Sequence, residues 1–282
     1  MIKIFSDSTC DLSEELLKRY DITLVPLHIE LGDKEYRDRI EITTDEIFAW
    51  SDANNKTPKT SACSMTDTMD AMKPVLDAGD EIVIFSISDS MSTTGNVFRL
   101  VTEELEAEEQ VSVIDSANLS TGIGLLVVEA AIMAQKGKSR EEIETRIEEL
   151  KPKVHASFIV DTLVYLHRGG RCSSVAALAG SLLKLHPKIV VENGAMSATK
   201  KYRGTIGKVT IDYVKEMEEQ LKCAKKDRVF ITHSKADDIV EEVKTYLKSL
   251  NIFDEIIVTE AGGVISCHCG PGTLGVLFID GE

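Results

Sequence analysis

The chain contains no apolar stretch that approaches the roughly 18 residues needed to span a membrane. Its residues 1–6 predict a strand and not the apolar core of a signal peptide. We therefore expect a cytoplasmic protein without stable membrane insertion, for which transient contact with a membrane surface stays open. Cysteine is also too sparse for a disulfide framework, because six residues spread over 282 positions predict buried or free thiols.

A net positive charge is absent as well, because 47 acidic residues against 32 lysines and arginines give a formal net charge of −15 at pH 7. Nucleic-acid binding needs a basic surface that neutralises phosphates, so no nucleic-acid partner is expected. Residues 168–208 are the exception, with eight lysines and arginines against the single acidic residue Glu192. This stretch predicts a site for a small anion or for an acidic patch on a partner protein; the alternative is a solvated face that balances nearby acidic helices.

Several motifs of nucleotide, hydrolase and metal sites are missing. The chain has neither Gly-x-x-x-x-Gly-Lys-Ser/Thr nor a strand-linked Gly-x-Gly-x-x-Gly that opens a helix. It also lacks the Gly-x-Ser-x-Gly motif of α/β-hydrolases. Cys267 and Cys269 flank His268, but no second ligand pair stands elsewhere at zinc-like spacing. We therefore expect no metal and no cofactor.

Short apolar runs alternate with amphipathic segments along the chain, which predicts two α/β units, the first with a mostly parallel sheet covered by helices. In the first half we expect strands at residues 2–5, 82–85 and 111–114, and helices at 11–20, 44–51, 67–76, 96–106, 121–135 and 141–150. In the second half we expect strands at 156–160, 188–191, 228–232, 255–259 and 276–279, and helices at 173–185, 209–222 and 237–250.

The break at Lys151-Pro152-Lys153 predicts the boundary between two α/β domains. The first would cover residues 1–152 and the second residues 153–282, and the segment near 60–78 is open to packing on the second. We expect Ser139 to cap the helix that precedes this break, and Asp11 or Ser13 to cap the first helix of the chain.

Residues 268–275 hold three glycines and a proline, which predicts a loop that passes close to another group, with His268 at its rim. Bare amides and an imidazole on a rigid support favour an anion site; a plain turn is the alternative. Hydroxyl-rich segments follow predicted strands at residues 6–9, 88–95 and 115–118, and another forms a turn before a predicted helix at residues 60–64. Ligands bind at such strand ends in open α/β sheets, although helix capping uses the same residue types.

Taken together, residues 6–9, 60–61, 87–92, 161–171, 186–188 and 268–275 resemble the DegV family, in the same order and across almost the whole chain. The resemblance implies two α/β domains with a long-chain fatty acid in the cleft between them. It also implies a non-catalytic carrier that presents the bound carboxylate to a fatty acid kinase for phosphorylation. The chain departs from the family pattern at Thr93-Thr94-Gly95, at Cys172 and at Ala62-Cys63, so its acyl preference is open.

By this resemblance, five residues would bind the carboxylate: Thr60, Ser61, Ser92, Arg171 and His268. Three others would line the pocket: Met91, Thr94 and Gly270. A basic group would dock the kinase: Lys200, Lys201 and Arg203.

Two enzyme classes remain as alternatives, a serine hydrolase and a phosphotransfer enzyme. Either would use Ser92 and His268 as nucleophile and base. No sequence feature nominates a third residue to orient the base, so a carrier is favoured over a catalyst.

Overall fold

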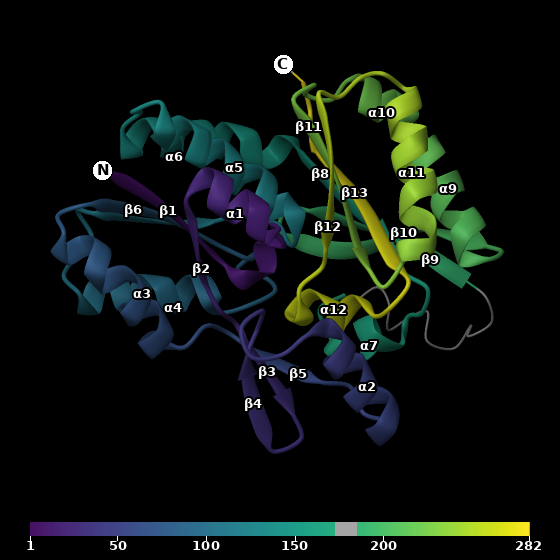
Figure 1. The fold of residues 1–282 in the computed structure, drawn as a ribbon, viewed down its shortest axis with the longest axis horizontal. Coiled ribbons are helices and arrows are strands. Elements are labelled where there is room, and N and C mark those ends of the chain that lie inside the picture. The colour runs from purple at the N-terminus through teal and green to yellow at the C-terminus, as the bar shows by residue number, and fades with distance from the viewer. Residues whose placement is uncertain (173–184, 282) are drawn as a thin grey trace.

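The structure is a computed structural model and describes residues 1–172 and 185–281 (Figure 1). In these ranges the chain is a mixed α/β fold, as predicted, and forms a four-stranded, a six-stranded and a three-stranded sheet. The helix predicted at residues 173–185 falls outside the described residues except for Leu185, which begins strand β9.

The four-stranded sheet is parallel throughout, in the order β2-β1-β6-β7. Its strands are β1 (Ile2–Asp7), β2 (Ile22–Val25), β6 (Glu81–Ser86) and β7 (Val111–Asp115). Five consecutive residues of β6 are buried, as expected for a strand covered on both faces. Helices α3 (Met65–Asp77) and α4 (Thr94–Glu104) cover one face, and α1 (Glu14–Tyr20), α5 (Thr121–Gln135) and α6 (Arg140–Leu150) cover the other.

The six-stranded sheet has the order β10-β9-β8-β13-β11-β12. Its strands are β8 (Val154–Ile159), β9 (Leu185–Glu192), β10 (Ala195–Arg203), β11 (Arg228–Ser234), β12 (Glu255–Glu260) and β13 (Thr273–Ile279). Only β11 and β12 pair in parallel. Helices α9 (Ile206–Glu216), α10 (Glu218–Lys222) and α11 (Asp237–Ser249) contribute to a core on one face.

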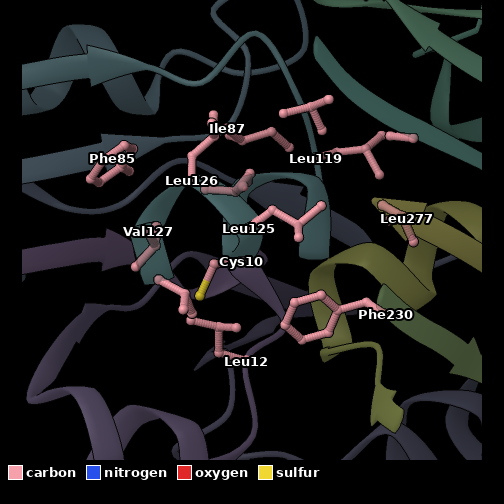
Figure 2. Packing of buried hydrophobic residues seen from close by; sticks show 14 of the residues in the cluster. Cys10, Leu12, Phe85, Ile87, Leu119, Leu125, Leu126, Val127, Phe230 and Leu277 are labelled. Carbon is pink, nitrogen blue, oxygen red and sulfur yellow. The ribbon is translucent and has the colours of Figure 1, made fainter. Parts of the chain in front are cut away.

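Helix α5 lies between these two sheets and joins their cores. Its residues 121–131 are all buried, so this part of the helix has no solvated face. Figure 2 shows its side chains Leu125 and Leu126 with Phe85 of β6 on one side and Phe230 and Leu277 of the six-stranded sheet on the other. A single apolar cluster therefore connects both sheets.

The three-stranded sheet, in the order β4-β3-β5, is small and was not predicted. It consists of β3 (His28–Leu31), β4 (Lys34–Arg37) and β5 (Lys59–Ser61), with α2 (Thr44–Asn54) beside it. Two short helices, α7 (Val164–Gly169) and α12 (Gly263–Cys269), pack against each other. Helix α12 also contacts β3, β5 and α2, and in Figure 1 it lies between them and the six-stranded sheet.

Two sequence predictions were wrong in detail. Residues 268–275 are not one loop: His268 and Cys269 end α12, residues 270–272 turn, and β13 already begins at Thr273. The predicted helix at 209–222 is two helices, α9 and α10, which are separated at Met217.

The predicted caps Ser13 and Ser139 were correct, because each side chain accepts a backbone N–H from the first turn of its helix. The four-stranded sheet draws all its strands from before η2 (Lys151–Lys153), and the six-stranded sheet draws all of its strands from after η2. On that ground we retain the domain boundary near residue 152 as a proposal.

Candidate functional site

A cavity of about 480 Å³ lies between α12, the six-stranded sheet, β5 and the loops that follow β6 and β7. Apolar side chains from both halves of the chain form much of its wall, among them Leu27, Ile87, Met91, Leu119, Phe158, Leu166, Met196, Val264, Ile265 and Leu277. All five residues predicted to bind a carboxylate also lie on this wall: Thr60, Ser61, Ser92, Arg171 and His268. The structure therefore brings together, at one cavity, residues that are up to 208 positions apart.

Thr60 and His268 form the central polar contact of the cavity. Thr60 Oγ1 and His268 Nε2 lie 2.8 Å apart, at hydrogen-bonding distance. Thr60 is held by the pairing of β5 with β3, where it lies opposite Ile29. His268 is held by α12, whose contacts with β3 and β5 bring the end of the helix to Thr60.

The imidazole of His268 is neutral near pH 7. Burial and, secondly, the positive charge of Arg171 lower the pKa of His268 to about 4. Its Nδ1 is buried and has no hydrogen-bond partner among the described residues. A proton on Nδ1 would be a buried unpaired donor, so the single proton of the neutral ring is better placed on Nε2. The neutral Nε2–H of His268 therefore donates to Thr60 Oγ1, and the hydroxyl proton of Thr60 is left to donate toward the cavity.

Ser92 lies in the loop between β6 and α4. Its Oγ is 2.9 Å from Thr94 Oγ1 and accepts a hydrogen bond from the Thr94 amide at 3.3 Å. This local bonding fixes the turn into α4 and keeps the Ser92 hydroxyl on the cavity wall.

Arg171 and Ser61 stand at exposed and half-exposed positions of the wall. Arg171 donates from Nη1 to the Gly169 carbonyl at 2.7 Å. Ser61 Oγ lies 3.5 Å from Glu35 Oε1. Both residues thus make a contact within the protein and also line the cavity.

The three predicted pocket residues are placed differently from one another. Met91 lines the cavity. Among the residues that the structure describes, Thr94 and Gly270 are not part of the wall: Thr94 is buried beside Ser92, and Gly270 packs close to Tyr165.

Two buried aspartates that the sequence did not nominate hold the start of α12. Asp11 Oδ1 accepts the Gly262 amide at 2.8 Å, and Asp38 Oδ1 accepts the Gly263 amide at 2.9 Å. Burial raises the pKa of Asp11 to about 7 and also raises that of Asp38. These carboxylates fasten one end of the helix whose other end carries His268.

Several hydroxyl-rich strand ends serve as caps, as the alternative interpretation proposed. Asp7 accepts the amides of Thr9 and Ile87, and Asp115 accepts the amide of Ala117. Ser88 and Ser90 both donate to the carbonyl of Gly194 in the β9–β10 turn. These contacts shape the loops around the cavity and join the two halves of the chain.

The structure offers little support for the enzyme alternatives. Within the described ranges, the side-chain bond of His268 goes to Thr60 and that of Ser92 goes to Thr94, so the two do not form a hydrogen-bonded nucleophile–base pair. The described residues contain no cluster of His, Cys, Asp and Glu suited to a metal ion. None of the described helices combines the length and apolar character that crossing a membrane requires.

The predicted docking residues Lys200, Lys201 and Arg203 are exposed on β10, an edge strand of the six-stranded sheet. Lys200 Nζ is bound to Glu216 Oε1 at 2.6 Å and lies over the ring of Tyr202. The group therefore forms a basic strip on a sheet edge, and its three residues are not among those that line the cavity.

Comparisons with known proteins agree with this architecture. A family model described as an uncharacterised protein of the DegV family matches residues 1–281. A DegV domain-containing protein of Clostridium perfringens is 32% identical over 282 residues, covering 99% of this chain and 98% of the relative.

Two solved structures are similar over the full length. A DegV family protein from Thermus thermophilus, described as binding fatty acid, has a TM-score of 0.91 and 30% identity, with 99% of both chains covered. A stearic acid-binding protein from Eubacterium ventriosum has a TM-score of 0.86 and 28% identity, with 99% of this chain and 98% of the other covered. Because the family model spans nearly every residue and curated relatives match end to end, this chain belongs to the DegV family.

Proposed function

We propose that this protein is a cytoplasmic carrier that binds a long-chain fatty acid in the 480 Å³ cavity and presents its carboxylate to a fatty acid kinase. The observation that carries the proposal is the convergence of Thr60, His268 and Arg171 on one cavity whose wall is largely apolar. Five of the six cysteines are buried, which suits structural thiols in a reducing compartment. The protein acts without a catalytic residue or cofactor of its own.

The apolar wall supplies the affinity. Removing ~14 methylenes of an acyl chain from water is worth on the order of 11 kcal/mol, at ~0.8 kcal/mol each. Association costs of several kcal/mol leave a surplus that supports tight binding. The cavity falls within the range of about 300–1,000 Å³ that is typical of small-molecule sites.

The polar residues fix the carboxylate. A carboxylate that leaves water needs hydrogen-bond donors or a countercharge in place of its hydration shell. The hydroxyls of Thr60, Ser61 and Ser92 are such donors, that of Thr60 being oriented by the neutral imidazole of His268. Arg171 adds positive charge at the exposed side of the wall. The carboxylate would therefore lie near the surface, where a second protein could reach it.

The basic strip on β10 supports a kinase-docking role. Lys200, Lys201 and Arg203 are exposed on a sheet edge of a strongly acidic protein. Such a local reversal of charge attracts an acidic partner surface and speeds association.

Replacing Thr60 by Val tests carboxylate binding. Valine keeps the shape of threonine but removes the hydroxyl that contacts His268. The loss of a hydrogen bond to a charged group, about 1.5–3 kcal/mol, should weaken stearate binding roughly 10- to 100-fold in isothermal titration calorimetry. Methyl stearate lacks the charge and should bind wild type and variant almost equally.

If the variant loses affinity equally for stearate and for methyl stearate, Thr60 supports the fold of the site and does not bind the carboxylate. No uptake of stearate, palmitate or oleate by the wild-type protein would overturn the proposal as a whole.

The docking step has its own test. Neutralising Lys201 and Arg203 should slow acyl phosphate formation by a cognate kinase but leave stearate affinity unchanged. The same change at exposed Lys248 on α11 is the matched control. If stearate affinity falls and the rate of acyl phosphate formation does not, the basic strip serves ligand binding and not kinase docking.

A further inference from the structure

Gly169, the last residue of α7, lies directly against the ring of His268. A Cβ atom built on Gly169 would fall 2.3 Å from His268 Nδ1 and 3.1 Å from Cε1. Separations below about 3 Å are far inside van der Waals contact, so a side chain at 169 and the present position of the ring exclude each other.

Further contacts hold the ring in its present position. Its Nε2 is held by Thr60 Oγ1 at 2.8 Å, and its Nδ1 is buried. The backbone at Gly169 is also held, because its carbonyl accepts a hydrogen bond from Arg171 Nη1 at 2.7 Å. Thr60 and Gly169 therefore enclose the imidazole from two sides.

The neighbouring Gly170 provides a contrast. Gly170 caps α7 with φ +66°, a left-handed conformation that favours glycine, and nothing lies within 4 Å of a Cβ built on it. Gly169 has no positive φ, and glycine within a helix is unfavourable relative to alanine. Backbone geometry thus explains why residue 170 is glycine, and the contact with His268 explains why residue 169 is glycine.

We infer that Gly169 is a positioning residue for His268: the bare backbone at the end of α7 is the surface that sets the plane of the imidazole and aims Nε2 at Thr60 and the cavity. The function assigned to the aimed Nε2 rests on the proposed fatty acid binding. The contact itself does not, and the two are tested separately.

A double-mutant cycle, read out as the Tm, tests the contact between Gly169 and His268 without any ligand. Gly169→Ala should lower the Tm of the wild-type protein because its methyl group overlaps the ring. In the His268→Ala background the ring is gone, so the same change should leave the Tm equal or raise it, as alanine favours helix. Gly170→Ala, the matched control, should lower the Tm by the same amount in both backgrounds.

Binding tests the positioning. Gly169→Ala should weaken stearate binding at least about tenfold, and should add less than about twofold to the loss caused by His268→Ala. Gly170→Ala should leave the affinity within about twofold. Full stearate affinity in Gly169→Ala, or independent losses that multiply in the double variant, would overturn the inference.

Imidazole ¹⁵N resonances of His268 give a readout that does not depend on the ligand. They should move in Gly169→Ala and stay in place in Gly170→Ala. If wild type binds no fatty acid, the proposed function fails, and this spectrum with the Tm cycle still decides the positioning. If Gly169→Ala alone does not fold, recovery of folding in the double variant with His268→Ala supports the contact, and continued failure to fold refutes it.

Discussion

Asp11 is a fully buried carboxylate whose ionisation should weaken the fold as the pH rises. Its Oδ1 accepts the Gly262 amide at the start of α12, and its Oδ2 accepts the Ser120 hydroxyl at 2.6 Å. Burial raises the pKa of Asp11 from 3.8 to about 7, although these hydrogen bonds and Arg39 act in the opposite direction.

The sign of the effect follows from proton binding. Between pH 3.8 and about 7 the folded protein holds a proton on Asp11 that the unfolded chain has released. The free energy of unfolding therefore falls as the pH rises through this window and levels off above it. At about 1.4 kcal/mol for each tenfold change in acidity, the full window corresponds to roughly 4 kcal/mol.

Asp11→Asn should remove this dependence. The asparagine oxygen can accept the Gly262 amide, and its NH₂ group can donate to Ser120, so the shape and contacts of the site are kept. Urea unfolding should show that the variant gains about 3 kcal/mol over wild type between about pH 5 and about pH 8. Other titrating groups, such as Asp7 and His268, are present in both proteins.

The exposed residue Asp33, in the turn between β3 and β4, provides the matched control. Asp33→Asn should follow the wild-type curve at every pH. Parallel curves for wild type and Asp11→Asn would refute the reasoning, because they would mean that Asp11 keeps the same charge at low and at high pH.

Two further predictions concern the packing between the two sheets. Glu129 of α5 is bound to Lys225 and Arg228, which hold its pKa below the usual range although burial acts in the opposite direction. Glu129→Ala leaves both cations without this partner and should lower the free energy of unfolding by about 3–5 kcal/mol in urea unfolding. A decrease of less than about 1 kcal/mol would contradict this. Phe230 is fully buried against α5, so Phe230→Ala should lower the free energy of unfolding by about 3–5 kcal/mol. A variant whose Tm lies within about 2 °C of wild type would contradict this, because it would mean that the neighbouring side chains close the cavity.

Sequence patterns predicted the elements whose signals are local. The runs that became β1, β6 and β7 are apolar and short, and helix α6 has a serine cap and a capping box within its own first turn. The three-stranded sheet escaped prediction because its strands are three or four residues long, and β4 and β5 carry mostly polar side chains that are exposed or half-exposed.

Helix α12 could not be predicted for a different reason. Its first amides are bound by Asp11 and Asp38, which are 251 and 225 residues away from their partners. No residue of its own first turn supplies a side-chain cap, so the local sequence resembles the glycine-rich turn that follows it. The family resemblance nominated both His268 and Thr60, but their contact with each other and the contact of His268 with Gly169 needed the fold.

Helix α12 therefore connects the stability of the fold to the geometry of the site. Its start is held by aspartates from the first half of the chain, and its end places His268 between Thr60 and Gly169. A seven-residue helix is too short to be stable alone, so these end contacts and its packing must define its position. Any change that loosens the start of α12 should then disturb His268 at its end, and ligand affinity should respond to substitutions that never touch the cavity.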